Sequence, residues 1–162
     1  MLRQIPLALV AAAFVLLASL VYVRFPIFPP GADTAVNSEP IQIVSTSPKI
    51  QIASSTISVH LADTEEERAR GLSGLAGLAE DEAMLFVFDA DGPHAFWMKD
   101  MRFAIDIVWI SRDGTIVHIE ENVGPETYPE VFVPRSEARY VVELSGGWVD
   151  RHNVTVGDIV RL

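Results

Sequence analysis

The chain has 162 residues, of which 49% are hydrophobic, and its 12 Lys and Arg against 22 Asp and Glu give a net charge of −10. So acidic a chain repels phosphate backbones, which argues against a nucleic-acid partner. The absence of cysteine excludes disulfides, thiolate nucleophiles and zinc–thiolate sites. The length suffices for one ordinary domain with additional segments at its termini.

The first predicted element is a hydrophobic helix at the N-terminus. Residues 5–23 run for nineteen positions without a charged side chain. A helix of that length spans about 28 Å, close to the thickness of the bilayer hydrocarbon core. Pro6 is tolerated in the first turn of such a helix, and the prolines after the segment end it. We therefore expect residues 1–30 to hold a transmembrane anchor.

A cleaved signal peptide is the alternative to a retained anchor. Its hydrophobic stretch would be shorter and would be followed by a small-x-small cleavage site. Residues 20–24 read Leu-Val-Tyr-Val-Arg instead, so the retained anchor is favoured. Arg3 and the terminal amine precede the segment and only Arg24 follows it, and the positive-inside rule then places the N-terminus in the cytoplasm. The sequence thus predicts a single-pass protein whose domain lies on the extracytoplasmic side of the cell membrane.

The segment after the anchor is predicted to be a flexible linker. Residues 31–55 are rich in Ser, Thr, Pro and Ala, a composition typical of tethers. Isoleucines at alternate positions hint at strand pairing, but Pro40 and Pro48 interrupt them. The regular pattern begins after this segment, so a single domain is predicted over residues 56–162.

Short strands and turns dominate the pattern of the predicted domain. Residues 57–61 alternate between apolar and polar side chains, as in a half-buried strand. Thr64 and Glu67 have the spacing of a capping box, which predicts a short helix that ends at Gly71.

Further strands and a second short helix are predicted along the rest of the domain. Asp113-Gly114 predicts a hairpin, because this dipeptide suits positions of positive φ, and Gly146-Gly147 opens the second helix. The predicted strands are residues 84–88, 95–98, 103–110, 115–120, 131–133 (a short edge strand), 139–144 and 154–160, the last broken at Gly157-Asp158. The series predicts a mainly β fold, either a jelly-roll-like sandwich or a partly open barrel with one or two short helices.

Seven short motifs follow one another along the domain: residues 67–72 (ERARGL), 84–88 (MLFVF), 96–100 (FWMKD), 105–108 (IDIV), 113–114 (DG), 143–147 (ELSGG) and 157–158 (GD). In this order they resemble the successive signatures of the domain of unknown function (DUF) 192 family, over roughly residues 57–162. The resemblance implies a compact β-rich fold of the jelly-roll or open-barrel kind, often behind a signal or anchor segment. It implies no established activity.

Two positions depart from the family's pattern. Ser73 follows Gly-Leu where the family usually has Met and sometimes Ser. Asp100-Met101 stands where the family tends to carry Asn-Thr. Any hydrogen bond that the Thr hydroxyl makes in other members is therefore lost in this chain.

Residues 96–99, Phe-Trp-Met-Lys, are the most suggestive candidate for a binding site. On a strand, Trp97 and Lys99 share one face, where an exposed Trp beside a Lys could stack a sugar ring or hold an anionic group. The commoner arrangement, which we expect, buries Trp97 in the core and extends Lys99 to solvent. His94 could join such a site, although a turn-capping role is commoner.

Arg70 and three acidic residues are the remaining candidates. Asp106 lies between two isoleucines of an apolar strand, and Arg70 is a natural partner for it or for Glu143. A structural ion pair is favoured over catalysis there. Asp100, Asp106 and Glu143 could also supply paired carboxylates for general acid–base chemistry. The four histidines lack metal-ligand spacing, so neither a metal nor a cofactor is predicted.

The preferred function hypothesis is a non-catalytic, membrane-tethered module that binds a small ligand or an envelope partner. It rests on the tether, the single domain and the absence of a catalytic pattern. The alternatives are a cell-envelope hydrolase that uses paired carboxylates and a structural accessory of a membrane complex. The candidate ligand-binding residues are Arg70, His94, Trp97, Lys99, Asp100, Asp106 and Glu143.

Overall fold

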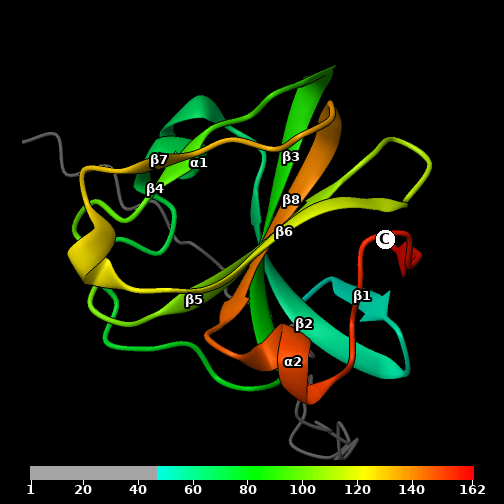
Figure 1. The fold of residues 1–162 in the computed structure, drawn as a ribbon, viewed down its shortest axis with the longest axis horizontal. Helices are drawn as coiled ribbons and strands as arrows, with labels where there is room; N and C mark the ends of the chain where they lie inside the picture. Colours follow the sequence, from blue (N-terminus) through cyan, green and yellow to red (C-terminus); the bar gives the residue numbers. More distant parts are fainter. Residues whose placement is uncertain (1–46) are drawn as a thin grey trace, which may run out of the picture. The chain divides into compact units, whose positions relative to one another are not determined.

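The computed structural model describes residues 47–162, whose strands form a strongly curled seven-stranded sheet and a separate two-stranded sheet (Figure 1). The strand order across the large sheet is β6-β5-β8-β3-β2-β1-β9. Its strands are β1 (Lys49–Ile52), β2 (Ser55–Ala62), β3 (Glu82–Gly92), β5 (Ile105–Ile110), β6 (Ile116–Val123), β8 (Ala138–Ser145) and β9 (Val160–Arg161). The smaller sheet pairs β4 (Phe96–Trp97) with β7 (Val131–Phe132). The prediction of a mainly β fold is confirmed.

Short helices connect the strands of the described part. α1 (Glu65–Arg70) lies between β2 and β3, which pair in parallel. The predicted capping box is present: the Thr64 hydroxyl accepts the N–H of Glu67, and the Glu67 carboxylate accepts the N–H of Thr64. α2 (Trp148–Arg151) follows β8, and a 3-10 turn, η1 (Pro125–Thr127), follows β6. Both predicted helices form.

The predicted hairpin at Asp113-Gly114 joins β5 to β6. The N–H of Ser111 donates to the carbonyl of Thr115 at 2.9 Å and closes the turn. Gly114 has φ +89°, and a Cβ there would lie 2.6 Å from the carbonyl oxygen of Val160. Two independent features therefore require glycine at this position: the backbone conformation and the close approach of β9.

The large sheet buries an apolar cluster on each of its faces. Because side chains alternate along a strand, Val142 and Leu144 of β8 pack into one cluster and Val141 packs into the other. Glu143 shares the face of Val141. The two-stranded sheet covers this second cluster, to which it contributes Phe96 and Phe132. The candidate site is built on this face.

Two segments differ from the prediction. β1 lies inside residues 31–55, predicted to be linker, and pairs with β2 on one side and β9 on the other. At the C-terminus the pattern predicts a strand over residues 154–160 that is broken at Gly157-Asp158, and β9 forms only after this break, over two residues. A turn precedes it, in which the Asp158 carboxylate accepts the N–H of Thr155 at 2.8 Å. The polar turn thus replaces most of the predicted strand.

The predicted anchor at residues 5–23 lies outside the described residues. Within residues 47–162, no helix has both the length and the apolar character that a membrane crossing requires. The tether therefore remains a prediction from the sequence.

Candidate functional site

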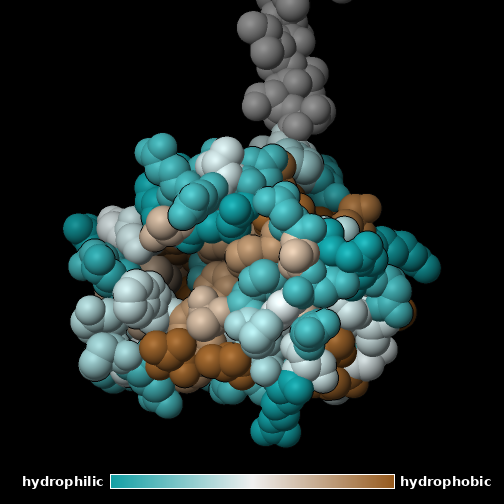
Figure 2. All heavy atoms as spheres, turned by 90° about the horizontal axis from the view of Figure 1, so that it is seen from above, coloured by the Kyte–Doolittle hydropathy of each residue, from teal (hydrophilic) through white to brown (hydrophobic). Residues whose placement is uncertain are grey.

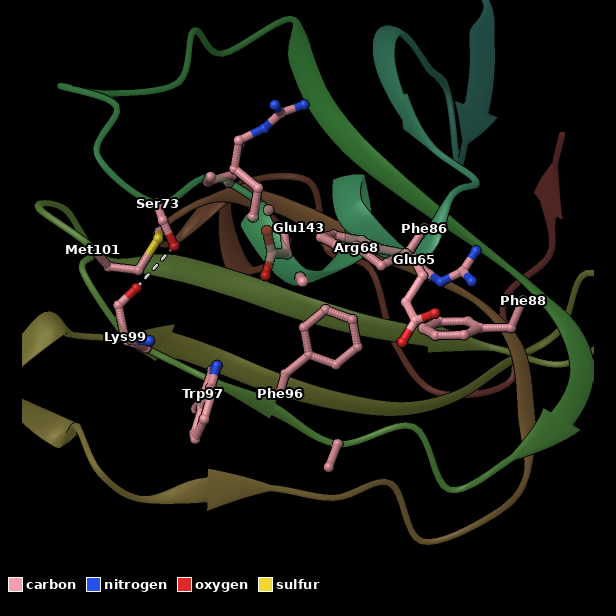
Figure 3. A pocket seen from close by; sticks show the side chains of 15 residues that line it. Glu65, Arg68, Ser73, Phe86, Phe88, Phe96, Trp97, Lys99, Met101 and Glu143 are labelled. Carbon is pink, nitrogen blue, oxygen red and sulfur yellow. Dashed lines mark hydrogen bonds between the residues drawn. The ribbon is translucent and has the colours of Figure 1, made fainter.

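A hollow with apolar walls opens on the face drawn in Figure 2, and mostly hydrophilic side chains surround it. A cavity of about 490 Å³ lies between α1 with its following loop, β3, β4 and β8. Figure 3 shows its lining side chains. They are Glu65, Arg68, Ala69, Arg70, Gly71, Leu72, Ser73, Phe86, Phe88, Ala95, Phe96, Trp97, Lys99, Met101 and Glu143.

Glu143 is the buried acidic group of this cavity. It lies on β8, between its neighbours Ile107 of β5 and Met84 of β3, and its exposed fraction is 5%. Among the described residues, its Oε2 atom is buried without a hydrogen-bond partner. Burial raises the pKa of Glu143 from 4.5 to about 8, because the apolar surroundings penalise the charged form. The side chain is therefore mainly a neutral carboxylic acid at pH 7, able both to donate and to accept a hydrogen bond.

Gly71 lies directly against this buried acid in the wall of the cavity. It ends α1 with φ +49° and ψ −138°, a conformation that side chains disfavour. A Cβ at this position would lie 3.9 Å from Oε2 of Glu143 and 3.5 Å from the ring of Phe86. Any larger side chain would fill the space beside the acid.

Aromatic side chains form the walls of the cavity. The rings of Phe86 and Phe96 meet edge to face with centroids 4.8 Å apart, and Phe96 contacts the buried Trp109 in the same way at 5.9 Å. Phe88 lines the cavity beside α1. Such edge-to-face packing fixes the ring orientations, so the walls are preformed.

Trp97 is 52% exposed, and the prediction that it fills the core is wrong. β4 belongs to the small outer sheet, and it is the next residue, Met98, that is buried in the core. The Trp97 ring meets the Tyr128 ring edge to face, with centroids 6.1 Å apart, and Lys99 Nζ lies 5.9 Å from the centre of the Trp97 ring. Trp97 and Lys99 thus form a cation–π pair at the edge of the cavity.

Three basic side chains line the cavity: Arg68, Arg70 and Lys99. Arg68 is held in place, because its Nη1 donates to the carbonyl of Val87 at 2.9 Å and its guanidinium lies 5.3 Å from the centre of the Phe88 ring. None of the three forms an ion pair with a carboxylate of residues 47–162. Their charges are therefore not neutralised by a direct partner.

The expected ion pair between Arg70 and Asp106 is not formed. Arg70 is exposed, whereas Asp106 is fully buried and accepts three backbone N–H groups. They belong to Asn122 at 2.6 Å, Gly147 at 2.9 Å and Val149 at 2.7 Å. The carboxylate thus ties the end of β6 to the start of α2, which is a structural role. Arg70 does not pair with Glu143 within the described part either.

The structure brings four of the predicted candidates to the cavity, Arg70, Trp97, Lys99 and Glu143, and leaves three outside its lining. Asp100 is exposed on a loop, with φ +57°. His94 stacks on Phe88 with centroids 3.5 Å apart, and its Nε2 lies 3.1 Å from the carbonyl oxygen of Ala90. Asp106 holds backbone groups elsewhere, as described above. The three acids that could form a catalytic pair are therefore not assembled around one site.

Sequence reasoning missed Arg68, Gly71 and the phenylalanine walls. The available signal was the run at residues 67–72, which places Arg68 and Gly71 three positions apart around the end of one helix. Within residues 47–162, no three His, Cys, Asp or Glu side chains are grouped as metal ligands would be.

The fold and the site together define a curled β-sheet domain with an apolar cavity that opens beside a buried acid. A profile of the DUF192 family, described as Uncharacterized ACR, matches residues 48–162, and the chain belongs to this family. The predicted family resemblance is confirmed. No curated protein gives a significant match.

Two solved structures are similar to the chain. A proposed transcription regulator of Sinorhizobium meliloti 1021 is 34% identical, with a TM-score of 0.64 over 69% of this chain and 88% of that one. A protein of unknown function from Novosphingobium aromaticivorans DSM 12444 is 24% identical, with a TM-score of 0.67 over 70% of this chain and 84% of that one. The second likeness supports the fold alone.

Proposed function

We propose that the chain is a membrane-tethered, extracytoplasmic module that binds a small ligand in the cavity beside Glu143. The observation that carries the proposal is the unpaired, buried Oε2 of Glu143 at an open apolar cavity. A buried polar atom without a partner costs about 1–3 kcal/mol. A ligand that donates a hydrogen bond to this atom recovers that free energy.

The cavity has the general features of a ligand site. Its volume of about 490 Å³ falls within the range of about 300–1,000 Å³ that is usual for small-molecule sites. Its walls are apolar and aromatic, and one buried polar group can orient the ligand. Trp97, exposed at the edge, offers a further stacking surface.

The tether is supported by the sequence of residues 5–23 and by the charge difference across that segment. The test is to express the full chain in a bacterial host and add protease to intact spheroplasts. We expect the β-rich domain to be degraded in intact spheroplasts while a cytoplasmic marker survives. Protection of the domain until the membrane is permeabilised would contradict the extracytoplasmic placement.

The hydrolase alternative has less support from the arrangement of acids. A raised pKa is a property of general acids, and Glu143 has it. Of the two acids predicted to assist it, however, neither Asp100 nor Asp106 lines the cavity. Glu65 does line it, on the exposed first turn of α1. Hydrolysis of a bound glycan or peptide that stops in Glu143→Gln would favour the enzyme over the binding module.

A thermal-shift fragment screen on the full chain tests the binding proposal, with two matched variants. Trp97→Ala removes a cavity wall, whereas Val131→Ala changes its cross-strand partner, which is also about half exposed but does not line the cavity. We expect to find fragments that raise the melting temperature of the wild type and of Val131→Ala by several degrees. The same fragments should raise the melting temperature of Trp97→Ala less. A screen without hits, or hits that stabilise Trp97→Ala as much as the wild type, would contradict the proposal.

A further inference from the structure

We propose that the cavity selects small organic anions that have an apolar ring, with the anionic group at Arg68 or Lys99 and a neutral hydroxyl or amide end at Glu143. This inference rests on the proposed function, because it names the ligand class of the same cavity. It follows from the distribution of charge, the fixed position of Arg68 and the chemistry of the cavity's buried acid.

The cavity concentrates positive charge in an acidic domain. Residues 47–162 contain 10 basic and 20 acidic residues. Three of the basic residues line the cavity, against only two acids, Glu65 and Glu143. Burial keeps Glu143 mainly neutral at pH 7, so the lining has a net positive charge. A concave positive site within a negative surface attracts anions and repels cations.

Two of these cations are placed to hold an anionic group. Arg68 is fixed by its bond to Val87 and its contact with Phe88, so it loses little side-chain entropy when it binds. Lys99 is held over Trp97. In the view of Figure 3 these two side chains lie on opposite sides of Glu143. An elongated ligand can therefore reach one cation while its other end lies at the acid.

The buried end of the cavity favours a neutral group. An anion buried among Phe86, Phe96 and Leu72 would carry a large desolvation penalty. A hydroxyl or an amide has no such charge and can donate to Oε2 of Glu143. A carboxylic acid can pair with an amide through one donated and one accepted hydrogen bond. The unpaired oxygen thus selects the polarity of the ligand's inner end.

The test uses a matched series of probes that share one ring. 4-Hydroxybenzoate, 4-hydroxybenzamide and 4-hydroxybenzylamine carry an anionic, a neutral and a cationic group opposite the same hydroxyl, and benzoate lacks the hydroxyl. Each is titrated into the isotope-labelled full chain and followed by NMR, on the amide of Gly71 and the indole N–H of Trp97. We expect 4-hydroxybenzoate to bind at least tenfold more tightly than the amide or the amine, and more tightly than benzoate.

Two variants with a matched control locate the anion. Lys99→Gln and Arg68→Gln each remove one lining cation, whereas Arg102→Gln removes a nearby exposed cation outside the lining. At least one of the first two substitutions should lower the affinity for 4-hydroxybenzoate about fivefold or more, and Arg102→Gln should leave this affinity unchanged. Lys99 forms no ion pair with the described carboxylates, so Lys99→Gln remains informative if Arg68→Gln disturbs the fold.

The outcomes separate this inference from the proposed function. If the amide or the amine binds as tightly as the acid, anion selection is wrong and the cavity remains a ligand site. If no probe of the series perturbs Gly71 or Trp97 while fragments of another class do, the inference is again overturned and the proposed function stands. If no fragment of any class reaches the cavity, both are wrong.

Discussion

Replacing Glu143 by glutamine should make the protein more stable at neutral and alkaline pH while leaving its stability near pH 4.5 almost unchanged. Glutamine keeps the size and the hydrogen-bonding capacity of the neutral acid but cannot ionise. The wild-type side chain has a pKa of about 8 in the folded protein and an ordinary value, about 4.3, in the unfolded chain. Between these two values only the folded state keeps the proton.

The sign and size of the effect follow from proton linkage. Where the folded state binds one proton more than the unfolded state, the free energy of unfolding falls by about 1.4 kcal/mol for each pH unit. From the shift of the Glu143 pKa from 4.5 to about 8, the wild type loses about 5 kcal/mol at most over that window. Below pH 4.5 the protonated Glu143 makes its full contribution to the free energy of unfolding, and above pH 8 this contribution is completely lost.

The assay is urea unfolding of the full chain at several pH values from 4.5 to 8.5, followed by the fluorescence of the buried Trp109 and Trp148. The difference between wild type and Glu143→Gln cancels the contributions of all other titrating groups. Glu65→Gln is the control, because it removes an acid that lines the cavity but is exposed. If the difference in the free energy of unfolding between wild type and variant does not change with pH, Glu143 is not a neutral acid in the folded protein. The same holds if the wild type becomes more stable relative to the variant as the pH rises.

Four further substitutions test other parts of the structure by the same unfolding assay. Trp97→Ala should lower the free energy of unfolding by about 1 kcal/mol or less, because Trp97 is half exposed. Replacement of the buried Trp109 by alanine should lower it by about 3–5 kcal/mol. Equal losses for the two variants would place Trp97 in the core. Asp106→Ala should destabilise the domain by about 3 kcal/mol or more, because it leaves three backbone N–H groups without an acceptor; a loss below 1 kcal/mol would show that other groups replace the carboxylate. Gly71→Ala should lower the free energy of unfolding by about 1–3 kcal/mol because of the positive φ at this position. It should also lower the affinity of any ligand of the cavity. A variant as stable as the wild type would contradict the backbone geometry.

Local patterns in the sequence predicted the local structure well. The capping box of Thr64 and Glu67 and the Asp113-Gly114 turn each depend on residues close in sequence, so their chemistry can be read directly. The alternating isoleucines of β1 were also a true signal. Pro48 does not interrupt the strand, because it stands just before it, where its missing N–H is harmless and its carbonyl accepts the N–H of Val59 at 2.8 Å.

Features that depend on distant segments could not be predicted in the same way. The partners of Asp106 are backbone groups at the end of β6 and the start of α2, at residues 122 and 147–149, and no side-chain pattern marks them. Trp97 is exposed because β4 pairs with β7 outside the large sheet, which strand periodicity alone does not reveal. Glu143 could be predicted as buried from its apolar strand, but its lack of a partner depends on the fold around it.

Binding in the cavity is tested most directly by the structure of the full chain crystallised with the fragment that stabilises it most. We predict that the fragment lies in the cavity between Phe96 and Gly71. A polar atom of the fragment should lie within about 2.6–3.2 Å of Oε2 of Glu143, the distance of a hydrogen bond. Fragments found only on other surfaces, with the cavity free of them and Glu143 without a contact, would contradict the proposal that this domain binds its ligand there.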